Sequence, residues 1–206
     1  MKKTLMTVLA LMPLALWAQD NTWELPEEEQ VEETKVVKVN PDAKYLRGAV
    51  PEVDGKVVFR KTVEAPGKKA SDIYDIVRKY MKKMLREKNQ INSQLVVDDS
   101  VNYQIGGRYE EWLVFKKTAI VLDQTRLIYV LEVKCQDGKA EVELSRIHYL
   151  YEEQRNPQRL TAEGWITDDD AVNKKNTKLY PMTGKFRRKT IDRKDFLFNK
   201  LESLLK

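Results

Sequence analysis

The sequence predicts an α+β domain in which helices cover one face of an antiparallel sheet. Three observations lead to this fold class. Short segments of alternating apolar and polar residues fill the middle of the chain, an amphipathic helical pattern precedes them, and a second helical pattern closes the chain. Strands joined by short turns pair antiparallel, and helices gathered on one face of such a sheet are then the economical architecture.

The chain begins with the pattern of an export signal. Lys2 and Lys3 precede an uncharged apolar stretch, and Ala18 is a small residue suited to a cleavage site. The stretch is shorter than the roughly 20 residues that a transmembrane helix needs. No cysteine lies near the cut, which excludes a lipid anchor there. We therefore expect residues 1–18 to be removed and the product to reach the periplasm or the cell exterior, with no transmembrane segment left.

Residues 19–52 are predicted to form an acidic leader followed by an extended linker. Seven carboxylates and no Lys or Arg lie between residues 19 and 33, a composition typical of segments without a packed core. The whole chain has a formal net charge of +5, so the remainder is basic. We expect residues 53–206 to form a single domain, because their number suits one hydrophobic core.

The first strand is predicted at residues 56–64, where Val57, Phe59 and Val63 share one side. The clearest helix of the chain follows. Its apolar residues recur at three- and four-residue steps up to Met84, while lysines fill the opposite face. The hydroxyl of Ser71 is expected to cap its first turn.

The middle of the chain is rich in strand patterns. Two adjacent glycines interrupt them and predict a turn there. The expected strands and turn are 95–97, 101–105, Gly106-Gly107, 111–117 and 119–122.

The strongest hairpin signal is Asp137-Gly138, a dipeptide suited to a two-residue turn. A turn at this point fixes the register of the flanking strands. The expected pairs are Cys135 with Ala140, Val133 with Val142 and Leu131 with Leu144 on the apolar face, and Lys134 with Glu141 and Glu132 with Glu143 on the other.

The charged face of this hairpin is expected to be wet, because two glutamates lie directly opposite one another on it. Beyond Ser145 the apolar phase shifts by one residue, to Ile147 and Tyr149. This shift predicts a β-bulge near Arg146.

The C-terminal part is predicted to be helical in two places. Thr167 and Asp170 have the spacing of a capping box, which predicts a short helix over 168–175. A basic stretch over 178–189, with Pro181 and Gly184, is expected to be irregular. A last helix is expected to begin with Asp192 as its cap.

The sequence resembles an exported family of Bacteroidetes-type bacteria. The similarity lies in residues 45–51, 54–59, Asp137-Gly138-Lys139 and 178–192. The family is classed as a domain of unknown function with a TATA-binding-protein-like fold. The resemblance covers about residues 45–206 and implies a curved antiparallel sheet with helices on one face. It implies no catalytic residues, and the fold name does not carry DNA binding with it.

Most catalytic chemistries lack their residues in this chain. One histidine, His148, and one cysteine, Cys135, are too few for a zinc site, and no metal or other cofactor is expected. Cys135 is expected on the apolar face of its strand, where burial makes a thiol inert. A pair of carboxylates in a cleft of the sheet would suit glycoside hydrolysis, so a hydrolase acting on envelope or extracellular glycans is the alternative to a non-enzyme.

The basic C-terminal region is the best candidate for binding. Eleven Lys or Arg residues oppose three acids between residues 174 and 206. Such a cluster can hold a phosphate- or carboxylate-bearing surface, although a solvated rim has the same pattern. The candidate residues are Lys174, Lys175, Lys178, Arg187, Arg188 and Lys189.

The sequence therefore predicts an exported, non-catalytic binding or scaffolding module. Its partner is expected to be an anionic envelope component, whether protein, lipid or glycan. Nucleic acid is not expected, because the export signal directs the chain away from the cytoplasm.

Overall fold

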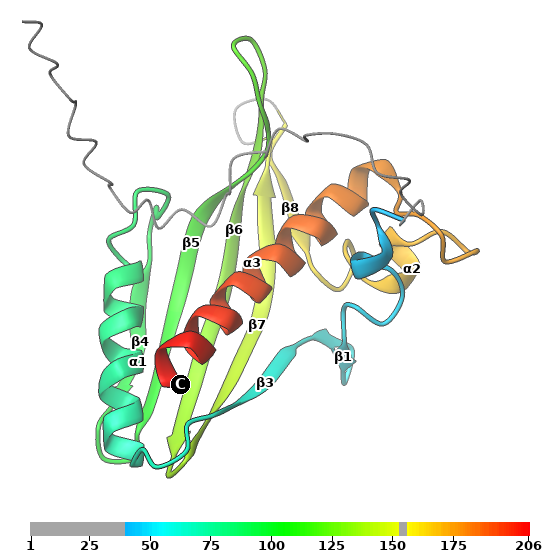
Figure 1. The fold of residues 1–206 in the computed structure, drawn as a ribbon. Coiled ribbons are helices and arrows are strands. Elements are labelled where there is room, and N and C mark those ends of the chain that lie inside the picture. Colours follow the sequence, from blue (N-terminus) through cyan, green and yellow to red (C-terminus); the bar gives the residue numbers. More distant parts are fainter. Residues whose placement is uncertain (1–39, 153–155) are drawn as a thin grey trace, which may run out of the picture. The chain divides into compact units, whose positions relative to one another are not determined.

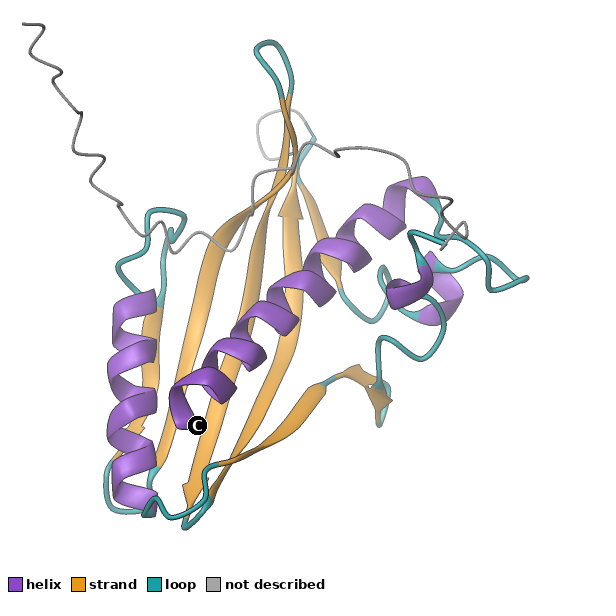
Figure 2. Cartoon of the chain, in the orientation of Figure 1, coloured by secondary structure: helices purple, strands orange, loops and turns teal. Residues whose placement is uncertain are grey.

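The computed structural model describes residues 40–152 and 156–206, so the predicted signal peptide and acidic leader lie outside the described residues. The described chain combines one large sheet with two long helices (Figures 1 and 2). Its elements are η1 (Ala43–Tyr45), β1 (Glu52–Val53), β2 (Lys56–Val57), β3 (Phe59–Glu64), α1 (Ala70–Met84), β4 (Gln94–Asp99), β5 (Gln104–Lys117), β6 (Leu122–Gln136), β7 (Lys139–Tyr151), β8 (Gln158–Thr161), α2 (Asp168–Ala171) and α3 (Pro181–Leu205).

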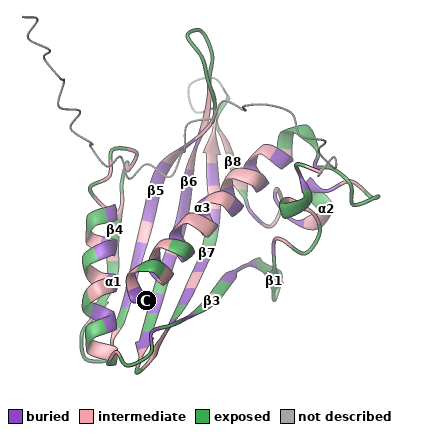
Figure 3. Ribbon diagram, in the orientation of Figure 1, coloured by how far each residue is buried: buried purple, intermediate pink, exposed green. Residues whose placement is uncertain are grey.

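The large sheet is antiparallel and has the strand order β3-β7-β6-β5-β4. Strand β8 also pairs with β7, beyond the end of β3. Helices α1 and α3 lie over the same face of this sheet (Figure 1), and their inner sides are buried against it (Figure 3). The predicted α+β class with helices on one face is confirmed. We call the opposite side of the sheet, which neither α1 nor α3 covers, the open face.

The β6–β7 hairpin has the predicted register. Cys135 pairs with Ala140 and Glu132 with Glu143, and both pairs follow from the two-residue turn at Asp137-Gly138. The register shifts by one residue between Ile128 and Val130, as predicted. Arg146 has a φ of 54° at this bulge, so the extra residue lies in β7.

Helix α1 is not capped by Ser71, because the helix begins one residue earlier, at Ala70. Its first free backbone N–H instead donates to a carboxylate that is distant in sequence. The distance from the Ala70 nitrogen to Asp137 Oδ1 is 2.8 Å. The β6–β7 turn thus positions the start of α1, a relationship that a local capping pattern does not contain.

The expected strands 101–105 and 119–122 are mostly turns, and only residues 104, 105 and 122 lie in strands. Residues 100–103 connect β4 to β5, and residues 118–121 form the tip of the β5–β6 hairpin. The short helix predicted over 168–175 ends at Ala171. Ile120, Val121 and Leu122 are aliphatic residues that favour strands, so the sequence predicted a strand here. In the structure their side chains are exposed at the end of the hairpin.

Helix α3 is a single helix of 25 residues, where the sequence predicted an irregular segment and a later start at Asp192. Pro181 lies in its first turn, where a missing N–H costs nothing. Gly184 lies inside the helix, at a point where the loop before α3 passes too close to leave room for a side chain. A Cβ on Gly184 would be 2.6 Å from the Cβ of Leu179, so contact with the preceding loop explains the glycine.

The segment from residue 40 to 52, expected to be linker, packs against the N-terminal half of α3. Tyr45 donates a hydrogen bond to Asp192 at 2.9 Å, Asp42 accepts from the backbone of Leu179, and Val50 is buried. Within residues 40–152 and 156–206, no helix is both long enough and apolar enough to cross a membrane.

Candidate functional site

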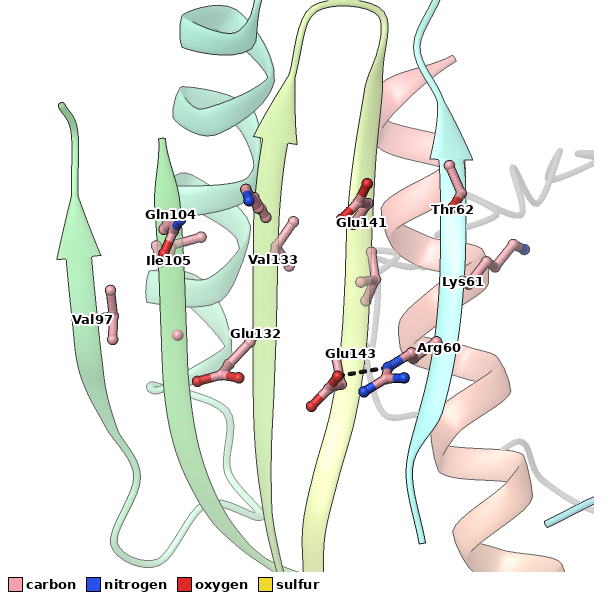
Figure 4. Close-up of a pocket in the computed structure, with 13 residues that line it drawn as sticks. Arg60, Lys61, Thr62, Val97, Gln104, Ile105, Glu132, Val133, Glu141 and Glu143 are labelled. Atoms are coloured by element: carbon pink, nitrogen blue, oxygen red, sulfur yellow. Dashed lines mark hydrogen bonds and ion pairs between the residues drawn. The ribbon is translucent and has the colours of Figure 1, made fainter. Parts of the chain in front are cut away.

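The open face of the sheet is hollowed by a cavity of about 600 Å³. Figure 4 views it with the helices behind the sheet, so neither α1 nor α3 covers it. Nine residues from five strands present their side chains, or a glycine Cα, to the open face. We call this cavity the basin, and its nine residues are Arg60, Thr62, Val97, Gln104, Gly106, Glu132, Lys134, Glu141 and Glu143.

One continuous row of paired residues crosses the whole sheet in the basin. In strand order it runs Arg60, Glu143, Glu132, Gly106 and Val97. Arg60 Nε donates to Glu143 Oε2 at 2.8 Å (Figure 4). The carboxylate of Glu132 has no hydrogen bond or ion pair to any other described residue. The row therefore carries two adjacent carboxylates and one cation to balance them.

Gly106 leaves the space between Glu132 and Val97. A Cβ at this position would be 3.3 Å from Glu132 Cγ and 3.5 Å from Val97 Cβ, so a side chain would fill the middle of the basin. Gly107 serves the opposite face, where a Cβ would be 2.6 Å from the ring of Tyr109. The predicted turn at Gly106-Gly107 is therefore wrong: both glycines lie within β5 and allow close approach on its two sides.

A second row lies next to the first. It pairs Thr62 with Glu141, Glu141 with Lys134, and Lys134 with Gln104. Hydroxyl, carboxylate, ammonium and amide groups thus alternate along it. Because strand side chains alternate between faces, Ile105, Val133 and Val142 point into the core between these rows and are buried there.

The basin provides hydrogen-bond acceptors more than donors. It has three carboxylates against one arginine and one lysine, and the arginine is already bound to Glu143. In the part of the chain that the structure describes, no three His, Cys, Asp or Glu side chains gather closely enough to hold a metal ion. The basin is therefore suited to hydrogen-bonding recognition of a group that donates.

The predicted basic region does not form one surface. Lys174, Lys175 and Lys178 are exposed on the loop between α2 and α3. The remaining candidates lie on α3 itself, and their environments differ from the expected open cluster.

Arg187 is fully buried, which corrects its assignment to a binding cluster. Its guanidinium donates to the backbone oxygens of Tyr45, Leu46 and Ile166 at 2.6–2.7 Å and to Asp168 at 2.6 Å. Burial lowers the pKa of Arg187, and the bond to Asp168 opposes that shift. Its donors are used within the fold and are not free for a ligand.

Arg188 is likewise engaged, since its Nη2 lies 2.7 Å from Asp42. Lys189 is half-buried on the same helix and also has an interaction partner. Arg187 and Arg188 therefore fasten residues 42–46 to α3, and the exposed lysines of the α2–α3 loop are what remains of the predicted surface. The sequence shows that the region is rich in Lys and Arg, but it does not show that Arg187 is buried.

Cys135 and His148 lie where the sequence placed them. Cys135 is 3% exposed, and burial raises the pKa of its thiol to about 12, which makes it a poor nucleophile. His148 is half-buried, with Nδ1 3.0 Å from the backbone oxygen of Arg146.

Sequence reasoning placed Glu132 opposite Glu143 and Lys134 opposite Glu141 on one face, but missed the five basin residues on the other strands. The available signal was the hairpin at Asp137, which fixes only the β6–β7 register. Arg60 and Gly106 join the same row through the β3–β7 and β5–β6 pairings, which no short turn specifies.

Comparison with known proteins identifies the family but no activity. No curated protein matches the chain. A crystal structure of a DUF4468 family protein from Bacteroides ovatus is 43% identical, with a TM-score of 0.74, and the match covers 80% of this chain and 94% of that one. A TBP-like protein from Parabacteroides distasonis shares 19% identity and a TM-score of 0.63 over 76% of this chain and 96% of that one, which supports the fold alone. The family model described as a domain of unknown function (DUF4468) with TBP-like fold matches residues 59–150. The 43% sequence identity to a DUF4468 family protein and the shared arrangement of sheet and helices show that the chain belongs to the DUF4468 family, whose fold is TBP-like.

Proposed function

We propose that this domain is a non-catalytic binding module of an exported protein, and that the basin on the open face holds its ligand. The basin is the observation that carries the proposal. Its volume of about 600 Å³ lies within the range of about 300–1,000 Å³ that small-molecule sites occupy. It also lies on the face of the sheet opposite α1 and α3 (Figure 4), so within residues 40–152 and 156–206 neither long helix stands between it and a ligand.

The chemistry of the basin favours a ligand with a cationic donor, an amine or a guanidinium. Glu132 lies directly opposite Glu143, and like charges in this position are unfavourable. Arg60 balances Glu143 alone. A positively charged ligand group beside Glu132 would complete the alternation of charge across the row, and Gly106 leaves room for it.

An anionic ligand suits the basin less well. A phosphate or nucleic acid backbone would meet Glu132, Glu141 and Glu143, whereas nucleic acid sites collect Lys and Arg. The exposed lysines Lys174 and Lys175 are the place where an anionic envelope component would bind instead.

A carboxylate-dependent hydrolase is also less well supported. Such enzymes hold one carboxylic acid in a shielded, apolar environment. Glu132 is exposed, and Glu143 is bound to Arg60. The two side chains are neighbours, but their surroundings are those of a binding surface.

The proposal is tested by NMR titration of the ¹⁵N-labelled protein with two amines, glucosamine and lysine amide. Their uncharged counterparts are N-acetylglucosamine and lysine amide acetylated on both its α- and its ε-amine. We expect the amines to shift the amide signals of Gly106, Glu132 and Glu143. Removing the charge in Glu132→Gln should weaken that binding by about tenfold, the value of a charge-assisted hydrogen bond.

Glu64→Gln is the matched control, because Glu64 is exposed on β3 and does not line the basin. Equal shifts from charged and neutral probes, or equal losses in both variants, would contradict the role of Glu132. Inorganic phosphate completes the set: shifts confined to Lys174, Lys175 and Lys178 would favour the anion-binding alternative.

A further inference from the structure

The β5–β6 hairpin projects beyond the rest of the sheet. Strands β5 and β6 remain paired as far as Lys117 and Leu122, whereas the last pair between β6 and β7 is Thr125 with Tyr151. Three residues at the start of β6 therefore extend past the other strands, by about 10 Å at the usual rise of a strand, and the turn adds to this. Figure 1 shows the hairpin as an isolated finger at one end of the sheet.

The end of this finger is apolar and exposed. Ile120 is 94% exposed, Val121 43% and Leu122 56%, and the tip stands out as exposed in Figure 3. A run of exposed aliphatic side chains is costly in water and marks an interaction site in a natural protein. The turn is held closed by the Thr118 nitrogen, which donates to the Val121 oxygen at 2.8 Å, so these side chains are presented by a defined backbone.

Two cations lie directly behind the apolar tip. Lys116 and Lys117 are both exposed, and neither side-chain ammonium has a hydrogen bond or ion pair among the described residues. Among the described residues, the acids at this end are Asp123 and Glu152. Asp123 pairs across the strands with Lys116 and is bound by Lys185 at 2.8 Å, and Glu152 follows the last paired residue of β7. The finger therefore carries a net positive charge next to its aliphatic end.

The root of the finger packs against helix α3. The ammonium of Lys185 lies 4.7 Å from the ring centroids of both Phe115 and Tyr151, and Phe186 packs against Phe115 with a centroid distance of 4.6 Å. Helix α3 thus clamps the strands just before they leave the sheet. A finger supported in this way keeps its apolar end directed away from the domain.

We propose that the hairpin tip, residues 116–122, inserts into the surface of a membrane that contains anionic lipid. Aliphatic side chains enter the boundary between headgroups and acyl chains, and adjacent lysines bind the anionic headgroups; these are the two signals that a peripheral protein combines. A protein partner is a poorer fit, because stable interfaces bury about 800 Å² on each side and this tip is a single turn. This proposal rests on residues that the basin does not include, so the two can fail separately.

The test is co-sedimentation of the chain without its predicted signal peptide, residues 19–206, with vesicles made of equal parts of phosphatidylglycerol and phosphatidylethanolamine, and with vesicles of phosphatidylcholine. We expect binding to the anionic vesicles that weakens at high salt. Ile120→Asp should reduce the partition coefficient by about tenfold, from the loss of one large aliphatic side chain and the added negative charge. Replacing both Lys116 and Lys117 by Gln should reduce it by roughly tenfold or more.

Val101→Asp is the matched control. Val101 is 83% exposed and lies in the turn at the opposite end of β5. The Val101→Asp variant should therefore bind vesicles as the unchanged protein does. Unchanged binding of Ile120→Asp, equal losses in both variants, or no preference for anionic vesicles would overturn the proposal. A self-association that Ile120→Asp abolishes, without vesicle binding by the unchanged protein, would assign the tip to a second copy of the chain and overturn it as well.

Discussion

Arg193 and Glu111 form a doubly hydrogen-bonded ion pair between α3 and β5. Nε and Nη2 of Arg193 each lie 2.6 Å from an oxygen of Glu111, and the side chains are 1% and 0% exposed. Burial alone would lower the pKa of Arg193, but the charge of Glu111 outweighs it, so the pKa is raised. Gln90 also donates to Glu111 at 2.6 Å, which ties the loop after α1 to the same centre.

Breaking this pair should strongly destabilise the fold. Glu111→Leu leaves Arg193 buried without its counterion, and Arg193→Met does the same to Glu111; each single replacement should cost about 3–5 kcal/mol. The double variant Glu111→Leu with Arg193→Met removes both charges and should cost less than the sum of the single changes. Urea unfolding monitored by tryptophan fluorescence gives the three values.

Arg60→Met is the control for this comparison. Its pair with Glu143 has the same chemistry, but Arg60 is 61% exposed, so water screens the interaction and the loss should not exceed about 1 kcal/mol. If the buried and the exposed pair prove equally important, the stabilising role assigned to Glu111 and Arg193 is wrong.

Arg187 should be required for folding and not for binding. Its removal in Arg187→Ala leaves three backbone oxygens and Asp168 without their donor, which should cost about 3 kcal/mol or more. Lys175→Ala, on an exposed loop of the same basic region, should stay within about 0.5 kcal/mol of the unchanged protein. Thermal unfolding of both variants checks this, and an equally stable Arg187→Ala would return the residue to the list of candidate ligand groups.

The parts of the fold that were predicted correctly are those that local chemistry determines. Asp137-Gly138 fixes a two-residue turn, and alternation then fixes the pairs of the β6–β7 hairpin from the turn as far as the bulge. The shift of the apolar phase located the bulge at Arg146, because a single inserted residue reverses the faces of a strand.

The parts that were missed depend on contacts between distant residues. Gly184 reads as a helix breaker until Leu179 is seen to occupy the place of its Cβ. Arg187 reads as a surface charge until the backbone of residues 45 and 46 is seen to accept its hydrogen bonds. The basin needs four strand pairings at once, and the sequence specified one of them.

The end of α3 should make stability depend on pH in the acid range. Glu202 lies 2.6 Å from the ammonium of Lys61 in β3 and 2.8 Å from that of Lys206. Hydrogen bonds from Lys206 and Lys61 lower the pKa of Glu202 from 4.5 to about 2. A lowered folded-state pKa means that the interaction stabilises the fold above pH 4.5 and is lost as the pH falls towards 2.

Glu202→Gln should therefore unfold at lower urea concentration than the unchanged protein near neutral pH, and the two midpoints should converge as the pH falls from about 4.5 to about 2. Glu64→Gln changes an exposed carboxylate on the same strand as Lys61 and should leave the pH dependence unaltered. A midpoint difference for Glu202→Gln that stays constant across this range would show that the variant disturbs packing at the helix end, and that the charge of Glu202 does not couple α3 to β3.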